Sequence, residues 1–309
     1  MKQAFTSQEI LTFHDAAYPE SLRQISGAPK NLFFCGNVAR LKSRSLGIVG
    51  ARNPTPDGLD NAYAFAKHLA ASGFCIVSGL ATGVDGAAHL GALDAGHSGA
   101  STIAVLGSGL DIIYPACHLD LAKRILDQDG LLVTEFAPGT PPLGRNFPKR
   151  NRIVAGLVLG VIVVEAAYKS GSLITAKLAN DMGREVFAIP GSIHSPLSRG
   201  PHALIQQGAK LVENATDILS ELAPEVMSTS GAGLFTSTDA SSKDVSESPL
   251  FQVIGYDPVS EDVLLRRSKM SFSQLSAELL ALELQGVVLR YPDGRIAKVR
   301  RKSSSDHVA

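Results

Sequence analysis

The sequence is poor in cysteine, lacks tryptophan and has no excess of either charge. Its three cysteines, Cys35, Cys75 and Cys117, are scattered along 309 residues and form no CxxC pair. This scarcity argues against a disulfide framework and against a zinc site, and it is typical of proteins in a reducing compartment. We therefore expect a cytoplasmic protein without structural zinc.

The charge balance and the short apolar runs limit the classes of protein further. Lysine plus arginine number 29 and aspartate plus glutamate number 29, so the formal net charge is zero. A neutral chain has no global field that draws it to DNA or to a membrane, so any polyanion must be bound locally. The first ten residues, MKQAFTSQEI, lack the apolar core of a signal peptide. The longest apolar run, residues 153–164, is shorter than the ~20 residues of a membrane helix, so we expect no membrane partner.

Short apolar runs rich in β-branched residues alternate with helix-like segments through the middle of the chain. Near-continuous apolar strands that alternate with amphipathic helices indicate a mostly parallel sheet covered on both faces. The predicted strands are LGIVG (46–50), FCIVSG (74–79), TIAVLG (102–107), LLVTE (131–135), VLGVIVVE (158–165), VFAIPG (186–191) and AKLV (209–212). The predicted helices are 57–72, 84–96, 118–128, 172–182, 198–207 and 215–223. We assign residues 41–225 to one doubly wound α/β domain.

The flanking regions differ from this core in character. Residues 1–40 form a short lead-in, in which HDAAYPESLRQI predicts a helix and APKNLFFCGN predicts an edge strand. Residues 226–250 are rich in serine and threonine, which is typical of a linker. In residues 251–303, two helix-like segments precede two strands around a Pro-Asp-Gly turn, and this order predicts a small winged-helix domain.

Glycine, serine and arginine recur where the predicted strands end. In open α/β sheets, ligands bind outside the carboxyl ends of the strands. Glycine lets the backbone approach a ligand there, and the free N–H groups of the next helix hold an anion. The segments concerned are Gly50-Ala51-Arg52, Gly107-Ser108-Gly109 and Lys169-Ser170-Gly171-Ser172. For any one loop a simple tight turn explains the glycines equally well, but the series together with Arg52 favours phosphate binding.

Residues arranged for catalysis are not evident in the sequence. The chain has no GxxxxGK[ST] phosphate loop, its GxGxxG pattern is incomplete, and its histidines show no metal-ligand spacing. We expect His118 and His202 at a helix start or on the surface. We expect Asp85 to cap a helix, and Glu135 and Glu165 to cap or to pair with arginines. The sequence therefore predicts a binding protein without catalytic residues, not an enzyme.

The stretch RNFPKRNR at 145–152 concentrates positive charge in an otherwise neutral chain. Its members Phe147, Lys149, Arg150, Asn151 and Arg152 lie between two predicted strands of the core. Guanidinium groups match phosphate oxygens, and an aromatic ring beside them stacks on a base. Cations along a groove with one stacking ring form the general design for binding single strands without reading their sequence. We therefore predict a site for single-stranded nucleic acid at this stretch.

Several long motifs resemble, in the same order, those of the DNA-processing protein A family, also called DprA or Smf. They are GARNPTPDG, SGLATGVDGAAH, GSGLDIIYP, EFAPGTPPLGRNFPKRNRIVAGL, EAAYKSGSLITAKLANDMGREVFAIPG and GAKLV, over about residues 10–223. The tail YDPVSEDVLLRRSKMSFSQLSAELLALELQGVV resembles the winged-helix domain often found at the end of this family.

The resemblance implies an extended Rossmann-like core that binds single-stranded DNA without strong sequence preference. It also implies protection of incoming DNA in natural transformation, help in loading the RecA recombinase, a homodimer formed through the core, and no need for nucleotide or metal. Arg52 is then expected to grip the DNA backbone. The other residues expected at the DNA pocket are Gly50, Ala51, Gly109, Phe147, Lys149, Arg150, Asn151, Arg152, Lys169, Ser170, Gly171 and Ser172.

The chain departs from the family pattern in several places, and other functions stay open. Residues 1–40 are too short for the SAM-like domain of many members, and His118 and His202 stand where asparagine is common. The basic residues of the winged helix fit a second DNA contact or ordinary solubility equally well. Related folds include phosphoribohydrolases of nucleoside monophosphates, but EAAYKSGSLITAKL lacks the double glycine and the glutamate of their PGGxGTxxE motif. A DNA-dependent regulator acting through the winged helix is the third alternative.

Overall fold

The computed structural model describes residues 9–96 and 101–222 and, nearer the carboxyl terminus, 250, 254, 258–268, 270–291 and 294–299. The chain divides into two units, Met1–Ala232 and Gly233–Ala309, and each is described by itself. The predicted linker, 226–250, lies outside the described residues except for residue 250. The predicted domain boundaries stay predictions.

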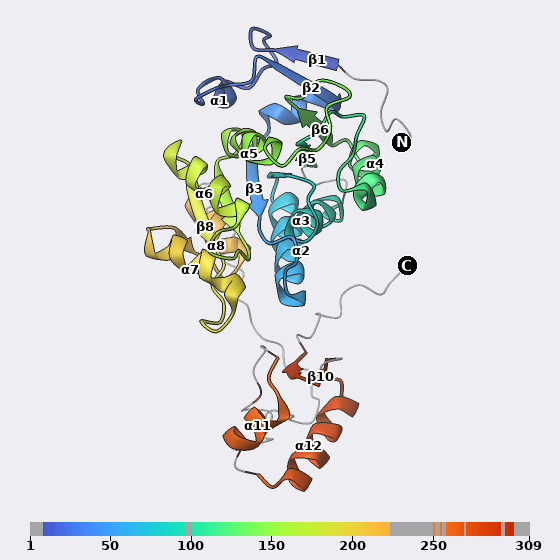
Figure 1. The fold of residues 1–309 in the computed structure, drawn as a ribbon, viewed down its shortest axis with the longest axis vertical. Helices are drawn as coiled ribbons and strands as arrows, with labels where there is room; N and C mark the ends of the chain where they lie inside the picture. The colour runs from blue at the N-terminus through green and yellow to red at the C-terminus, as the bar shows by residue number, and fades with distance from the viewer. Residues whose placement is uncertain are drawn as a thin grey trace. The chain divides into compact units, whose positions relative to one another are not determined.

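Seven parallel strands form the centre of the first unit (Figure 1). They are β3 (Ser45–Val49), β4 (Cys75–Ser78), β5 (Thr102–Val105), β6 (Leu131–Thr134), β7 (Gly160–Val163), β8 (Glu185–Ala188) and β9 (Lys210–Leu211). Every residue of β3 to β7 is buried, as expected for a parallel sheet that helices cover on both faces. The full order in the sheet is β1-β2-β6-β5-β4-β3-β7-β8-β9. The predicted mostly parallel α/β sheet is confirmed.

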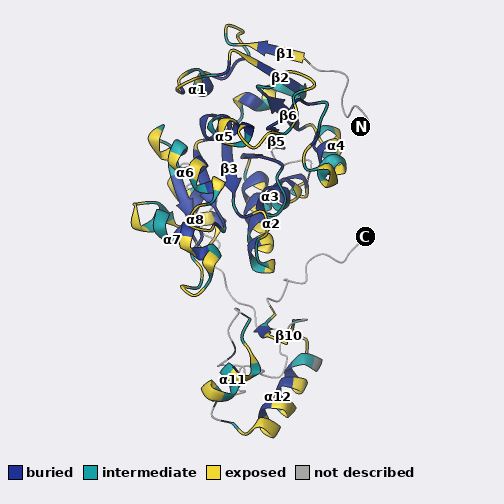
Figure 2. Cartoon of the chain, in the orientation of Figure 1, coloured by how far each residue is buried: buried dark blue, intermediate teal, exposed yellow. Residues whose placement is uncertain are grey.

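Helices cover both faces of the sheet because side chains along a strand point alternately to the two sides. Ile48 of β3 packs in one cluster with the first group of helices, and Val49 packs in another with the second group. Figure 2 shows the buried strands in dark blue and the exposed outer surface of the helices in yellow. The first group is α2 (Pro56–Ala71), α3 (Val84–Leu93) and α8 (Ala215–Leu222). The second is α5 (Asn146–Leu157), α6 (Gly171–Asp181) and α7 (Arg199–Gln206), while α4 (Leu119–Asp127) completes a third cluster with β5 and β6.

The amino-terminal segment extends the same sheet with two antiparallel strands. It contains β1 (Glu9–Thr12), the short helix α1 (Glu20–Arg23) and β2 (Asn31–Gly36). β2 pairs with β6 on one side and with β1 on the other. The prediction of an edge strand in this segment is therefore wrong for β2, because β1 covers its outer side and becomes the edge.

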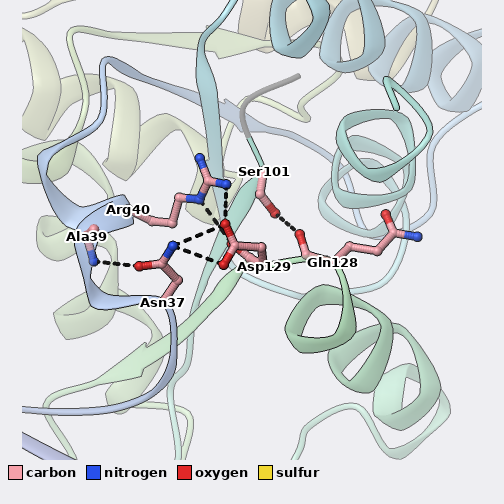
Figure 3. Close-up of polar contacts among 6 residues, drawn as sticks. All are labelled: Asn37, Ala39, Arg40, Ser101, Gln128 and Asp129. Carbon is pink, nitrogen blue, oxygen red and sulfur yellow. Dashed lines mark hydrogen bonds and ion pairs between the residues drawn. The ribbon is translucent and has the colours of Figure 1, made fainter. Parts of the chain in front are cut away.

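Hydrogen bonds and an ion pair join the residues after β2 to the turn between α4 and β6 (Figure 3). Arg40, in the 3-10 helix η1 (Val38–Lys42), lies 2.6 Å from the Asp129 carboxylate and donates a second bond to the Asp129 carbonyl at 3.0 Å. The Asn37 side chain donates to both carboxylate oxygens of Asp129 at 3.0 and 3.1 Å. These bonds from Asn37 and then Arg40 lower the pKa of the Asp129 carboxyl. They also hold Asp129 at φ +59°, a conformation that few residues other than glycine adopt.

The described residues of the second unit form two helices followed by a hairpin. They are α11 (Glu261–Ser268), α12 (Phe272–Leu284), β10 (Val288–Arg290) and β11 (Ile296–Lys298), with the two strands antiparallel. α12 begins with a capping box, in which Ser271 and Gln274 satisfy each other's backbone N–H groups. Its inner side packs Leu275, Leu279 and Leu282 into a small separate core. The predicted winged-helix arrangement is confirmed.

Candidate nucleic-acid interface

A cavity lies at the point where the strand order reverses. From β3 the chain adds β4, β5 and β6 on one side, and it then returns to add β7, β8 and β9 on the other. Ligands of open α/β sheets bind at such switch points, outside the carboxyl ends of the strands. The cavity has a volume of about 460 Å³. Its lining includes Gly50, Arg52, Ala81, Asp85, Phe147, Pro148, Arg150, Asn151, Ser170, Gly171, Ser172 and Thr175.

Arg150 places a buried cation in this cavity. It comes from α5 and is only 5 % exposed, and its Nη2 donates a hydrogen bond to the Gly79 carbonyl at 3.1 Å. A Cβ on Gly79 would lie 1.5 Å from Arg150 Nη1, so the guanidinium rests directly on the Gly79 backbone. Burial lowers the pKa of Arg150, and the nearby Asp85 carboxylate opposes this shift. An arginine stays protonated at neutral pH, and its Nε has no partner among the described residues.

Asp85 fixes the loop after β4 beside this cation. It lies in the first turn of α3, is 7 % exposed, and accepts hydrogen bonds from the N–H groups of Gly79 at 3.1 Å and Ala81 at 3.4 Å. Burial raises the pKa of the Asp85 carboxyl, although Arg150 and these bonds lower it. Between them Leu80 has φ +58° and a fully buried side chain, so the loop is held in a strained form. Asp85 thus has a structural role, but the predicted capping role is wrong, because Gly83 is the N-cap of α3 and no side chain caps this helix.

Arg52 and Phe147 meet at the cavity. The Arg52 guanidinium carbon lies 5.3 Å from the centre of the Phe147 ring, a cation–π distance. Within 9–96 and 101–222, no ion pair or hydrogen bond joins the exposed Arg52 side chain to another residue. Phe147 is half-buried, and it packs so closely on Gly107 that a Cβ there would lie 2.9 Å from the ring. The guanidinium is therefore positioned by an aromatic face while its charge has no acidic partner in that part of the chain.

The amino terminus of α6 forms another side of the cavity. Ser170 caps this 11-residue helix, because its Oγ accepts a hydrogen bond from the Ser172 N–H at 3.3 Å. Asn151 of α5 donates to the Gly171 carbonyl at 3.2 Å and so joins the two helices. The first N–H groups of a helix and its dipole favour negative charge. Together with Arg52 and Arg150, this helix end gives the cavity a positive lining suited to phosphate.

The structure does not bring all predicted site residues into the cavity. Arg152 forms an ion pair with Glu135 instead, and burial raises the pKa of that glutamate despite the arginine. Lys149 and Lys169 are exposed outside the cavity lining. Gly109 is buried against the loop at 137–140, where a Cβ would lie 2.8 Å from the Ala137 carbonyl oxygen. The carbonyl of the buried Ala51 accepts a hydrogen bond from the Val84 N–H at 3.1 Å.

The other titratable residues singled out in the sequence have structural partners. Glu165 accepts hydrogen bonds from the Thr55 N–H at 2.8 Å and hydroxyl at 2.6 Å, and Thr55 caps α2. His118 precedes α4 and lies 2.9 Å from the Leu80 carbonyl, and His202 is 3.0 Å from the Gly191 carbonyl. The predicted pairing of Glu135 with an arginine is confirmed. The capping predicted for Glu165 is wrong, because Thr55 caps α2 and Glu165 accepts hydrogen bonds from that capping residue.

Sequence reasoning missed Tyr114 and Asn146. The Tyr114 ring lies 5.8 Å from the Phe147 ring, between centres, with an angle of 44° between their planes. Asn146 is buried and donates to the carbonyls of Gly107 at 3.1 Å and Pro141 at 3.2 Å, which fixes the start of α5. The Tyr-Pro pair after β5 was the signal that could have indicated Tyr114, and no local pattern indicated Asn146.

Comparison with known proteins agrees with this architecture. Residues 9–223 match the family model for DNA recombination-mediator protein A, and residues 236–294 match that for the DprA winged helix domain. Protein Smf of Escherichia coli is 42 % identical over 293 residues, which cover 92 % of this chain and 75 % of that protein. DNA processing protein DprA of Streptococcus pneumoniae is 47 % identical over 222 residues, covering 71 % of this chain and 75 % of that protein.

Two solved structures share the fold of the core. The X-ray structure of DNA processing protein A from Streptococcus pneumoniae covers 71 % of this chain and 75 % of its own, with 45 % identity and a TM-score of 0.66. A structure of DNA processing protein A from Helicobacter pylori, determined to explain how that protein binds single-stranded DNA, covers 72 % of this chain and 98 % of its own. Its identity is 30 % and its TM-score 0.64. With both of its units matched, the chain belongs to the DNA recombination-mediator protein A family, known as DprA or Smf.

Proposed function

We propose that this protein binds single-stranded DNA in the cavity at the strand-order reversal. The observation that carries the proposal is the contact of Arg52 with Phe147, which presents a cation and an aromatic ring side by side. A phosphate is attracted by Arg52, by the buried Arg150 and by the amino terminus of α6. A base adjacent to that phosphate then stacks on the Phe147 ring. The single-strand binding of the Helicobacter pylori relative supports the same ligand here.

The proposed role is binding without catalysis. A hydrolase acting on a nucleotide needs a carboxylate or another base that is free to move a proton. Glu135, which follows β6, forms an ion pair with Arg152. Glu165, which follows β7, accepts a hydrogen bond from the Thr55 N–H. Asp85 accepts two backbone N–H groups. Because each of the three already has a structural partner, we favour a DNA-binding protein over the phosphoribohydrolase alternative.

Membership of the family supports a more specific role. We propose that the protein, in the cytoplasm, protects single-stranded DNA that enters during transformation and helps load the RecA recombinase onto it. We also propose that it acts as a homodimer formed through the core. Both proposals rest on the family resemblance. The cavity residues support them only by accounting for the binding of single-stranded DNA.

Fluorescence anisotropy of a labelled oligonucleotide tests DNA binding. The wild type, Arg52→Gln and Lys42→Gln are titrated against single-stranded and duplex DNA over a series of salt concentrations. Lys42 is exposed and precedes β3, at the opposite end of that strand from Arg52, so its variant matches the charge change away from the cavity. We expect the wild type to bind single strands more tightly than duplex. Each lost phosphate contact reduces the slope of log K against log salt by about 0.7.

The outcomes separate the alternatives. Weakened binding by Arg52→Gln with a shallower slope, and unchanged binding by Lys42→Gln, supports the cavity as the DNA site. Equal loss in both variants contradicts it, because the attraction then depends on total charge. If the wild type binds neither form, the cavity is reassigned to a small phosphorylated ligand and the enzyme alternative becomes the leading one.

A further inference from the structure

Tyr114 is an exposed aromatic side chain directly beside the proposed DNA site. It follows β5, and its side chain is 45 % exposed. Its ring centre is 5.8 Å from that of Phe147, and Phe147 in turn lies under the guanidinium of Arg52. Phe147 thus has a cation and a second ring as neighbours. Arg52, Phe147 and Tyr114 come from the loop after β3, the start of α5 and the loop after β5, respectively.

The loop that carries Tyr114 is fixed on both sides of the ring. Before it, Ser108 Oγ donates to the Ile112 carbonyl at 2.7 Å, and Leu110 is fully buried. After it, the His118 N–H donates to the Pro115 carbonyl at 3.0 Å. A tyrosine side chain has two torsions and loses little freedom when it binds a ligand. The backbone that carries the ring is therefore fixed before any ligand arrives.

A single exposed apolar residue is ordinary on a protein surface and needs no function. Tyr114 differs from such a residue in its neighbours, because it extends an aromatic surface that already borders a positive cavity. Tyr168 provides the contrast within the same unit. It is 68 % exposed, lines a different cavity and has no ring contact within the described residues.

We propose that Tyr114 stacks on a second base of the bound single strand, next to the base on Phe147. This inference rests on the proposed DNA-binding function and adds a base contact to it. Arg52 then holds the phosphate backbone, and the two rings hold successive bases. Because every base has a π-face, two stacking rings increase affinity without selecting a sequence. Tyr114 contributes through its ring, and its hydroxyl is not required.

The test compares Tyr114→Leu, Tyr114→Phe and the control Tyr168→Leu in the full-length protein, with a normal oligonucleotide and one of the same length containing abasic sites. Stacking losses correspond to a roughly 5- to 150-fold change in Kd. We expect Tyr114→Leu to weaken binding of the normal strand within that range, with an unchanged salt slope. Tyr114→Phe and Tyr168→Leu should bind like the wild type. The abasic strand should bind equally to all four proteins.

Each contrary result has its own meaning. Wild-type affinity in Tyr114→Leu, or an equal loss with the abasic strand, overturns the second base contact and leaves the proposed function intact. Failure of the wild type to bind single strands overturns the proposed function itself. If Tyr114→Leu melts at a lower temperature than the wild type, photo-cross-linking of wild-type protein to DNA containing 5-iodouracil decides instead. Cross-links in the peptide with Tyr114 support the proposal, and cross-links found only elsewhere overturn it.

Discussion

Arg150 Nη2 donates a hydrogen bond to the carbonyl of Gly79 at 3.1 Å, and this contact joins α5 to the loop after β4. A side chain on Gly79 would collide with the guanidinium, since a Cβ would lie 1.5 Å from Nη1. The glycine is therefore required by the close approach of a charged side chain. Its backbone torsions do not require glycine, because Gly79 is not among the residues with positive φ.

Replacing Gly79 with alanine should displace the Arg150 guanidinium and weaken DNA binding. Overpacking of this kind costs about 1–3 kcal/mol of stability. Losing a charge-assisted contact to phosphate costs about 1.5–3 kcal/mol, or roughly tenfold or more in Kd. Gly144→Ala is the matched control, because Gly144 lines the same cavity and nothing lies within 4 Å of an added Cβ. Thermal melting and anisotropy should show both losses in the first variant and neither in the second.

Arg52 and Arg150 should respond differently to truncation. Arg52→Ala should keep its stability within about 0.5 kcal/mol, since the side chain is exposed, and should lose affinity for single strands. Arg150→Ala should lose stability as well, because it leaves the buried Asp85 carboxylate without its nearby cation. The pKa of Asp85, already raised by burial, should then rise further. Unfolding measured in urea separates the two variants, and equal stability would contradict the structural role of Arg150.

His89 should make stability fall as the pH is lowered. It is fully buried, and burial, followed by the charges of His118 and Arg150, lowers its pKa from 6.5 to about 3. Thr102 Oγ1 donates to the Ile76 carbonyl at 2.5 Å, so it accepts the proton on His89 Nδ1 at 2.8 Å. His89 Nε2 is therefore an unprotonated acceptor, and it has no partner among the described residues.

The direction of this pH dependence follows from the linkage between proton binding and folding. Below pH 6.5 His89 binds a proton in the unfolded chain but stays unprotonated in the folded protein. Folding stability is therefore lost between pH 6.5 and about 3. The loss approaches about 1.4 kcal/mol per pH unit in this range. His89→Gln should flatten the decline in melting temperature between pH 6.5 and 4.5. Parallel curves for the variant and the wild type would assign the decline to other groups.

Phe147 should contribute to DNA binding without contributing to its salt dependence. Phe147→Leu keeps an apolar side chain over Gly107 but removes the aromatic face. We expect weaker binding to single strands by about 1–3 kcal/mol and an unchanged salt slope, because stacking releases no counterions. A slope change like that of the Arg52 variant would show that the ring acts only by positioning the guanidinium.

The core of the fold was predictable because its signals are local. Strands buried on both faces are near-continuous apolar runs, and some of them end at a glycine, as β3 does before Gly50. The segment EILT of β1 was missed, since it is short and only one of its four residues is buried. The order of the strands depends on contacts between distant segments, and no local pattern encodes it.

The site was predictable in position but not in the role of each cation. Arg150 and Arg152 are two positions apart on α5, so they point in different directions on the helix. The sequence does not tell which direction faces the cavity, and it gave both residues the same role. In the structure Arg150 lines the cavity, and Arg152 forms an ion pair with Glu135, which follows β6.

The central place of β3 has a consequence for the order in which the protein becomes functional. β3 pairs with β4 on one side and with β7 on the other. A chain emerging from the ribosome has β3 to β6, and with them Arg52 and Asp85, before α5, β7 and α6 have been synthesised. At that point Arg150, Phe147 and Ser170 have not yet been synthesised. The complete cavity therefore appears only when the second half docks onto β3, and the DNA strand that we propose for this cavity would contact both halves of the sheet.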